Sequence, residues 1–226
     1  MIRCVVFDLW NTLVQSEGGS PFQQVKALLT EDQRAAYPEL VRDGMRHDHP
    51  TAESFLAGWR ERLGLASDQE QAMAQAFAAA DAEARLFPET LTALNRTREL
   101  GRLALLSNTQ RFDLALLGRL GLDPYFRVKG LSAELGALKP EPEIFERLQQ
   151  KLGLFPGNLV MVGDSWTDDV EGALAAGWTA IWVNRKGLPR PEHDPDAELV
   201  EVDSLDQVPV VVERLQAGMR CSTCLG

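Results

Sequence analysis

The chain has 226 residues and a mass of 25.0 kDa, and its 33 acidic residues exceed its 23 Lys and Arg residues, which gives a formal net charge of −10. Hydrophobic residues make up 45% of the sequence, a normal share for a globular protein, and the length suits one large domain or one domain with a modest insertion. The negative charge disfavours binding to nucleic acid or to an anionic membrane, because contacts to phosphates need clustered Lys and Arg.

The sequence predicts a cytoplasmic protein with no membrane segment. No apolar run reaches the roughly 18 residues of a membrane-spanning helix, and the N-terminal MIRCVVFDLW lacks the apolar stretch of a signal peptide. Cys4, Cys221 and Cys224 are odd in number and poorly spaced for a disulfide framework. The terminal CSTC lacks two of the four ligands of a zinc site, so we interpret it as part of a loose tail over residues 217–226. A metal shared across a dimer is the alternative.

Short apolar runs alternate with helical patterns along most of the chain. Residues 2–7 (IRCVVF) form a Val-rich run that ends at an acid, which is typical of a buried strand. Further runs lie at 103–106, 159–162 and 179–183, and helical patterns lie at 89–100, 112–120, 141–152 and 168–176. This alternation predicts an α/β fold with a parallel sheet covered on both faces, whose ligands bind at the C-terminal ends of the strands.

Residues 15–86 break this alternation, because they contain no clear strand run. Helical spacing occurs at 22–29, 52–63 and 69–85, with breaks expected at Pro21, Pro38, Pro50 and Gly64. We interpret the segment as a helical insertion after the first strand, where it is placed to act as a lid over the site. The alternative is a solvated helical decoration. Residues 186–197 are Pro-rich and polar and predict a loop.

Polar side chains gather at one edge of the predicted sheet. Asp8 ends the first strand, and Asn11 and Thr12 follow it with donors that suit an anionic substrate. The other groups are the donors Ser107, Asn108 and Thr109 after LALL, Lys139 in ALKPEPEIF, and Asp164, Asp168 and Asp169 in MVGDSWTDDVEGA. Each alone has a structural explanation as a turn cap, a helix N-cap or a surface charge. Together, several carboxylates, a hydroxyl and one lysine suit a divalent cation and a phosphate.

These segments resemble the haloacid dehalogenase-like hydrolase superfamily over nearly the whole chain. VVFDLWNTLV, LLSNT, LKPEPEIF and VGDSWTDDVEGALAAGW occur in the order of the family's motifs, and the helical insertion resembles its C1-type cap. The resemblance implies a Rossmann-like catalytic core over residues 1–14 and 87–216 and an inserted α-helical cap domain over residues 15–86. It also implies a nucleophilic aspartate and, in most members, phosphoryl transfer that depends on Mg²⁺.

The resemblance assigns the catalytic roles residue by residue. Asp8 matches the nucleophile that forms an aspartyl-phosphate, Ser107 the hydroxyl that holds the transferring phosphoryl group, and Lys139 the lysine that steadies both charges. A carboxylate attacks phosphorus when a metal and an ammonium neutralise the repulsion between the anions. The expected substrate is a small phosphorylated molecule, which water then releases as phosphate from the aspartyl-phosphate.

The resemblance also implies the Mg²⁺ ligands. Asp8 and Asp164 match ligands of the metal, Asp169 matches the second acid of the last motif, which binds the metal directly or through water, and the residue at position 10 contributes its backbone carbonyl. Position 10 is Trp10 in this chain. Asp168 occupies a position that is often polar in the family, and we rank it below Asp169.

Trp10 departs from the pattern of the family's phosphatases, which carry at this position an Asp that protonates the leaving group and activates water. An indole donates one N–H hydrogen bond and transfers no proton at neutral pH. Because general acid–base catalysis is worth about 10²–10⁴-fold, we expect weak activity on simple alkyl phosphomonoesters and a smaller loss on acyl or aryl phosphates. His47 or His49 of the insertion is a candidate replacement, and a solvated surface histidine is the alternative.

Two other functions stay open. The 2-haloacid dehalogenases of this superfamily carry an aromatic residue at the position of Trp10 and need no metal, but they lack the acid found here at Asp164 and carry a Tyr where this chain has Phe145. A feeble or non-catalytic protein that binds a phosphorylated ligand would also retain the polar set. The substrate and the oligomeric state do not follow from the sequence. Phe22, Met45, Phe55 and Trp59 suit either the core of the insertion or a pocket wall.

Overall fold

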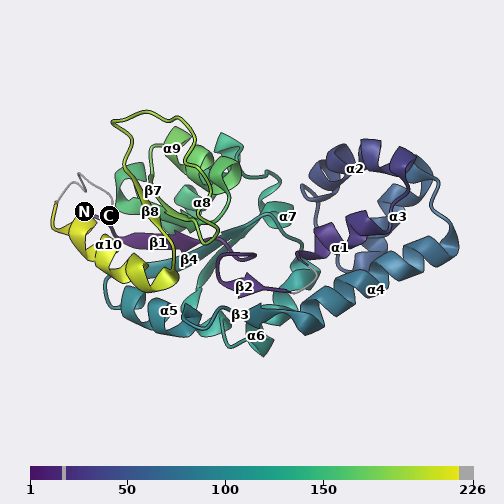
Figure 1. Ribbon diagram of the computed structural model, residues 1–226, viewed down its shortest axis with the longest axis horizontal. Coiled ribbons are helices and arrows are strands. Elements are labelled where there is room, and N and C mark those ends of the chain that lie inside the picture. Colours follow the sequence, from purple (N-terminus) through teal and green to yellow (C-terminus); the bar gives the residue numbers. More distant parts are fainter. Residues whose placement is uncertain (17–18, 219–226) are drawn as a thin grey trace.

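A six-stranded parallel sheet forms the centre of the molecule in the computed structural model, which describes residues 1–16 and 19–218 (Figure 1). The strands in spatial order are β5 (Val128–Leu131), β4 (Arg102–Ser107), β1 (Cys4–Phe7), β6 (Leu159–Gly163), β7 (Thr179–Val183) and β8 (Leu199–Val202). Neighbouring strands pair in parallel throughout. The predicted parallel sheet is therefore confirmed. Cys221 and Cys224 lie outside the described residues.

Helices cover both faces of the sheet, as the alternating pattern predicts. Val5 and Phe7 of β1 pack with one set of helices, and Cys4 and Val6 pack with the other, because successive side chains of a strand point to opposite faces. The first set comprises α5 (Thr90–Arg98), α6 (Ala115–Arg119) and α10 (Val208–Gln216), and the second comprises α8 (Pro142–Leu152) and α9 (Gly172–Ala175). Since β1 is buried on both faces, its sequence is continuously apolar.

Along the chain, four helices follow β1 and precede the next strand of the sheet, and they pack around an apolar cluster of their own. They are α1 (Pro21–Ala27), α2 (Glu31–Gly44), α3 (Ala52–Leu63) and α4 (Ser67–Glu83), and we call them the four-helix segment. It lies to one side of the sheet in Figure 1. Phe55, Trp59, Met73 and Phe77 form the centre of its cluster. The first three helices each begin with a capping box, which satisfies backbone N–H groups that the helix leaves free.

The remaining elements are short. They are the ribbon strands β2 (Val14–Gln15) and β3 (Arg85–Leu86), the helix α7 (Ser132–Leu135), the π-helix η4 (Trp166–Glu171), and the 3₁₀ turns η1 (Arg111–Leu114), η2 (Asp123–Tyr125), η3 (Pro156–Asn158) and η5 (Leu205–Gln207). The antiparallel ribbon β2–β3 joins the sheet to the four-helix segment. Residues 186–197 form a loop, as predicted. Among the described helices, none combines the length and the apolar character that a bilayer crossing requires.

The structure corrects the sequence interpretation at several elements. Pro38 lies inside α2 instead of ending a helix, because Tyr37 and Leu40 of that helix are buried in the four-helix cluster and this packing outweighs the lost backbone hydrogen bond. We expected no strand in residues 15–86, but the two-residue strands β2 and β3 lie at the two ends of this stretch and pair with each other. The edge strands β5 and β8 and the helices α2, α7 and α10 were not predicted, and Lys129 and Gly130 make β5 an atypical strand sequence.

Ala in place of Gly172 should destabilise the protein. A Cβ atom at Gly172 would lie 2.6 Å from Cε2 of Phe145 and 3.1 Å from the backbone of Pro140, so a packed core would have to move. We expect Gly172→Ala to lower the free energy of unfolding by about 1–3 kcal/mol. The matched control is Gly58→Ala in α3, where a Cβ meets no atom within 4 Å, and it should raise the same free energy by up to about 1 kcal/mol. Urea unfolding of both variants measures the difference, and equal shifts would contradict it.

Candidate active site

The polar groups predicted at the sheet edge line one pocket of about 330 Å³. Its lining residues are Asp8, Trp10, Asn11, Ser20, Phe22, Ser107, Asn108, Lys139, Asp164, Ser165, Asp168 and Asp169. Asp8, Ser107 and Asp164 come from the ends of β1, β4 and β6, which are neighbours in the sheet. Ser20 and Phe22 come from the start of α1, so the four-helix segment forms part of the wall.

Lys139 is the centre of the charge arrangement in this pocket. Its Nζ lies 2.7 Å from Oδ1 of Asp8 and 2.5 Å from Oδ1 of Asp169, and all three side chains are buried. Asn108 fixes the backbone of Lys139, because its Nδ2 donates to the Lys139 carbonyl at 3.0 Å and its Oδ1 accepts from the Lys139 N–H at 2.8 Å. We expected Asn108 to bind substrate, and the structure gives its side chain this positioning contact.

Asp164 completes a group of carboxylates. One ligand oxygen from each of Asp8, Asp164 and Asp169 lies within 4.8 Å of the others. The Thr12 hydroxyl donates to Oδ1 of Asp164 at 3.4 Å and accepts from the Asp164 N–H at 3.1 Å. Thr12 is therefore buried behind Asp164 and is not among the lining residues, although we expected it to contact substrate.

Thr109 also lies away from the pocket wall. Its side chain is buried, and its backbone N–H donates to the Ser132 hydroxyl at 3.0 Å. Because Thr109 directly follows Asn108 in the sequence, we expected both at the pocket. The sequence could not show that the Thr109 side chain is buried away from it. Of the predicted substrate-binding residues, Asn11 and Asn108 line the pocket in the described structure, and Thr12 and Thr109 do not.

The electrostatics of the carboxylate group indicate that it holds too much negative charge for one lysine. Burial and the nearby charge of Asp8 raise the pKa of Asp164 to about 7. Burial also raises the pKa of Asp169, with Asp8 and Asp164 adding to the effect and Lys139 opposing it. Three close carboxylates and one ammonium carry a formal charge of −2 when ionised. Hard divalent cations prefer oxygen ligands, so this donor set fits Mg²⁺.

Further oxygen donors and close packing support this fit. No backbone hydrogen bond from the described residues ends on the Trp10 carbonyl, so this oxygen is free to bind a cation. Asp169 is placed by Gly163, where a Cβ would lie 2.1 Å from Oδ2 of Asp169, and by the Ser165 N–H, which donates to that oxygen at 3.0 Å. Both oxygens of Asp169 are thus already bonded, one to Ser165 and one to Lys139.

The turn that follows Asp8 is held by Arg185, which sequence reasoning missed. Asn11 adopts a left-handed backbone with a φ of 60° at the tip of this turn. Arg185 Nη2 donates to the Thr12 carbonyl at 3.2 Å, Nη1 lies 2.5 Å from Oε1 of Glu89, and the guanidinium stacks 3.7 Å from the centre of the Phe87 ring. Arg185 comes two residues after the apolar run of β7, at the same sheet edge as the site. This position after a strand end could have marked it as a candidate site residue.

The histidines of the four-helix segment do not reach the pocket in this structure. His47 is exposed, and His49 packs edge-on against Phe55 with ring centres 5.3 Å apart. Neither lines the pocket among the described residues, so a replacement for the missing acid at Trp10 is not found there. Phe55, Trp59 and Met45 are buried core, whereas Phe22 is half-buried and lines the pocket.

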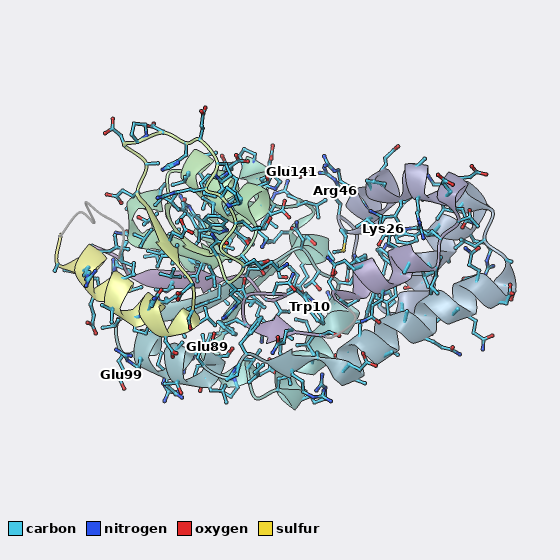
Figure 2. All side chains as sticks on the ribbon, viewed as in Figure 1. Trp10, Lys26, Arg46, Glu89, Glu99 and Glu141 are labelled. Atoms are coloured by element: carbon cyan, nitrogen blue, oxygen red, sulfur yellow. The ribbon has the colours of Figure 1, made fainter. Side chains whose placement is uncertain are left out.

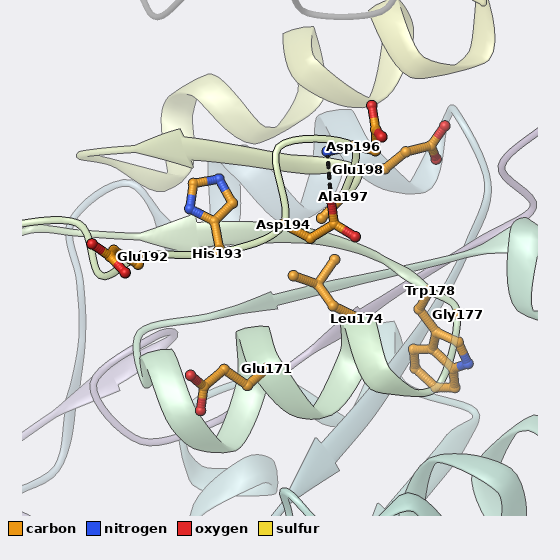
Figure 3. A pocket seen from close by; sticks show the side chains of 10 residues that line it. All are labelled: Glu171, Leu174, Gly177, Trp178, Glu192, His193, Asp194, Asp196, Ala197 and Glu198. Atoms are coloured by element: carbon orange, nitrogen blue, oxygen red, sulfur yellow. Dashed lines mark hydrogen bonds between the residues drawn. The ribbon is translucent and has the colours of Figure 1, made fainter.

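A second hollow, of about 480 Å³, contains none of the predicted site residues (Figure 3). Its lining residues are Glu171, Leu174, Gly177, Trp178, Glu192, His193, Asp194, Asp196, Ala197 and Glu198. In the described part of the chain, the carboxylate and histidine atoms that converge closely enough to hold a metal are those of Asp8, Asp164 and Asp169. The first pocket is therefore the candidate active site.

Comparison with known proteins identifies the family. The model of the haloacid dehalogenase-like hydrolases matches residues 2–177. The chain belongs to this family. As a haloacid dehalogenase-like hydrolase it is an enzyme, and its relatives favour phosphatase over dehalogenase activity. A phosphoserine phosphatase of Thermus thermophilus is 36% identical over 67% of this chain and 65% of its own length, slightly less than two thirds. Human N-acylneuraminate-9-phosphatase is 26% identical over 98% of both chains.

Solved structures of the same family share the fold. A 2-haloacid dehalogenase from Pseudomonas syringae superimposes with a TM-score of 0.67 at 26% identity and covers 95% of this chain and 100% of its own. A phosphatase from Thermococcus onnurineus superimposes with a TM-score of 0.63 at 24% identity, which shows the fold alone. The Rossmann-like α/β architecture is thus common to relatives named as dehalogenase and as phosphatase, so the fold does not decide between the two activities.

The stability of the metal-free protein should fall as the pH rises toward neutrality. The pKa of Asp164 is raised from 3.8 to about 7 in the folded state, so its contribution is present below pH 3.8 and is lost as the pH rises through about 7. We expect the melting temperature in EDTA to fall between pH 5 and 8, and Asp164→Asn to flatten this slope. Glu61→Gln, at an exposed carboxylate of α3, is the control. An unchanged slope in Asp164→Asn would contradict the assignment.

Proposed function

We propose that this hydrolase removes phosphate from a small phosphorylated metabolite, with Mg²⁺, through an aspartyl-phosphate on Asp8. The observation that carries the proposal is the Asp8 carboxylate, held 2.7 Å from the Lys139 ammonium in a pocket that it shares with Asp164 and Asp169. The phosphatase names of the relatives support the same chemistry. The substrate of each relative is a property of that protein.

The described contacts suggest how the chain's own groups act. Oδ1 of Asp8 accepts from Lys139, and no described hydrogen bond reaches Oδ2, which is the oxygen we assign to the attack on phosphorus. The Asp8–phosphorus bond forms as the bond from phosphorus to the leaving oxygen breaks. Ser107 and Asn11 line the pocket where the phosphoryl oxygens would lie. Water then attacks the aspartyl-phosphate and restores the Asp8 carboxylate.

Asp8, Asp164 and the Trp10 carbonyl are the groups we assign to Mg²⁺. When bound, Mg²⁺ supplies positive charge against the phosphoryl oxygens and reduces their repulsion of the Asp8 carboxylate. Asp169 is assigned a contact through water, because its two oxygens already accept from Lys139 and Ser165. The Lys139 ammonium, 2.7 Å from the Asp8 carboxylate, would offset part of the repulsion between this carboxylate and the phosphoryl oxygens.

We assign the four-helix segment, within residues 15–86, the role of the cap domain. Ser20 and Phe22 bring it to the pocket wall. At another contact with the core, Arg46 forms an ion pair with Glu141, and Figure 2 labels both residues. Glu141 also accepts from the Leu138 N–H at 3.1 Å, next to Lys139. Cap position and the lysine loop are thereby linked through one carboxylate.

Dehalogenation is the second candidate, favoured by the aromatic side chain of Trp10 and by the structural likeness to a 2-haloacid dehalogenase. The site argues against it. The Asp164 carboxylate would repel a carboxylate substrate in the absence of a metal. Phe145, at the position where the dehalogenases carry a Tyr, is fully buried under the sheet, packed edge-on against Trp178. We therefore place phosphate-ester hydrolysis first.

Loss of the nucleophile should abolish the reaction. We expect hydrolysis of an aryl phosphate and of an acyl phosphate by the native protein with Mg²⁺, and none above background in EDTA or in Asp8→Asn, which keeps the size of the side chain but removes its nucleophilic charge. Phosphate release measures the rates. Glu61→Gln should retain full activity. Binding of Mg²⁺ and inorganic phosphate without turnover would contradict the proposal and indicate a protein that only binds a phosphorylated ligand. Turnover of a 2-haloacid would contradict it and indicate a dehalogenase.

Restoring an acid at position 10 should raise the activity on poor leaving groups. An Asp in place of Trp10 would supply the proton that an alkoxide leaving group needs, and general acid catalysis is worth about 10²–10⁴-fold. We expect Trp10→Asp to increase kcat on an alkyl phosphomonoester by at least about tenfold and to change kcat on an acyl phosphate little. Trp10→Asn, which has a similar size to Asp and transfers no proton, is the matched control. Equal gains in both variants would point to relief of crowding instead of acid catalysis.

A further inference from the structure

From the pocket walls we infer the substrate class, an inference that rests on the proposed function. The geometry points to a phosphomonoester whose leaving group carries an amine and no second anion. The inference draws on three features of the same pocket. Within the described part of the chain, they are the absence of a spare cation, the carboxylate of Asp168 without a hydrogen bond or ion pair, and the aromatic side chains of Trp10 and Phe22.

The described lining of the pocket offers no cation for a second anionic group. Lys139 is the one Lys or Arg among the described lining residues, and its ammonium is already shared by Asp8 and Asp169. With Mg²⁺ and Lys139 present, four ionised lining aspartates still leave the pocket with a formal charge of −1 before substrate binds. A carboxylate or second phosphate on the leaving group would therefore enter a site of its own sign.

Asp168 is the carboxylate that an amine would meet. It is half-buried and lines the pocket, and among the described residues no hydrogen bond or ion pair involves its carboxylate. Its backbone is fixed, because its N–H donates to the Ser165 hydroxyl at 3.2 Å. Burial raises the pKa of Asp168, and Arg42, an exposed residue in the last turn of α2, attracts the Asp168 carboxylate electrostatically and opposes this rise. Arg42 does not line the pocket.

Trp10 and Phe22 add two aromatic side chains to the lining of the same pocket. Trp10 comes from the turn after β1, and the label in Figure 2 places it between the sheet and the four-helix segment. Phe22 comes from the first turn of α1, where its ring packs edge-on against Phe55 and Phe77 at centroid distances of 5.8 and 5.2 Å. Aromatic faces attract ammonium groups, and a fixed ring loses little freedom when it does so. An amine held by Asp168 meets these rings, whereas a carboxylate is repelled by both the acid and the ring faces.

The test compares three aryl phosphates that differ in the charge at the para position. The substituents are aminomethyl, ethyl and carboxymethyl, and the methylene next to the ring keeps the three phenols similar as leaving groups. With Mg²⁺ we expect kcat/KM for the aminomethyl compound to exceed that for the ethyl compound by about tenfold, and the carboxymethyl compound to be the poorest. Equal values for the three, or the carboxymethyl compound as the best, would overturn the inference.

Two variants identify the groups responsible. Asp168→Asn should bring the ratio of kcat/KM between the aminomethyl and ethyl compounds toward one, and the Mg²⁺ concentration for half-maximal rate shows whether the metal site has changed. Arg42→Ala should leave the order of the three compounds unchanged. A preference for the carboxymethyl compound that disappears in Arg42→Ala would instead show that Arg42 closes over an anionic leaving group, and the inference would be wrong.

Failure of the inference is distinguishable from failure of the proposed function. Turnover of the ethyl compound that needs Mg²⁺ and Asp8 supports the hydrolase whatever the order of the three compounds. If none of them turns over, calorimetric binding of the three to the native protein with Mg²⁺ measures the same order without catalysis. Tighter binding of the aminomethyl compound then supports the amine-binding wall, and equal binding overturns it.

Discussion

The buried ammonium of Lys139 between Asp8 and Asp169 is the interaction on which the rest of the site depends. A charge in a buried position is tolerated only with close partners of opposite sign, and removing one member of such a group costs about 3–5 kcal/mol. Lys139 reaches both partners because Asn108 holds its backbone from both sides. The same arrangement leaves an excess of carboxylates, so the site that stabilises the lysine also attracts a divalent cation.

The parallel sheet supplies the convergence that this interaction requires. Asp8, Ser107 and Asp164 stand at the ends of three neighbouring strands, so side chains far apart in the sequence share one edge without help from a flexible loop. Close backbone packing completes the geometry, because only a glycine at position 163 leaves room for the Asp169 carboxylate. The four-helix segment has a separate core, which lets it contribute Phe22 to the pocket without disturbing the charged groups.

The sequence predicted what depends on local pattern and missed what depends on distant partners. The four central strands are buried on both faces and therefore form continuous apolar runs, whereas the edge strands β5 and β8 are partly exposed and lack that signal. The strand-end rule located Asp8, Ser107 and Asp164, whereas Lys139 follows the helix α7 and not a strand, so its role came from the family resemblance. The rule could not show that Thr12 turns inward to Asp164, which is 152 residues away, or that Arg185 holds the turn after Asp8.

Trp10 connects the chemistry of the site with its selectivity. A carboxylate at this position would add a fifth acid to a pocket whose described lining already holds Asp8, Asp164, Asp168 and Asp169, and each further acid raises the pKa values of the others. The indole of Trp10 avoids that repulsion, but it also cannot donate the proton that a carboxylic acid at this position would give to the leaving group. The chain then depends on a leaving group that departs with little protonation, or on one that carries its own positive charge. Asp168, whose carboxylate has no hydrogen bond or ion pair among the described residues, lines the same pocket as Trp10 and Phe22 and is the group we assign to such a charge.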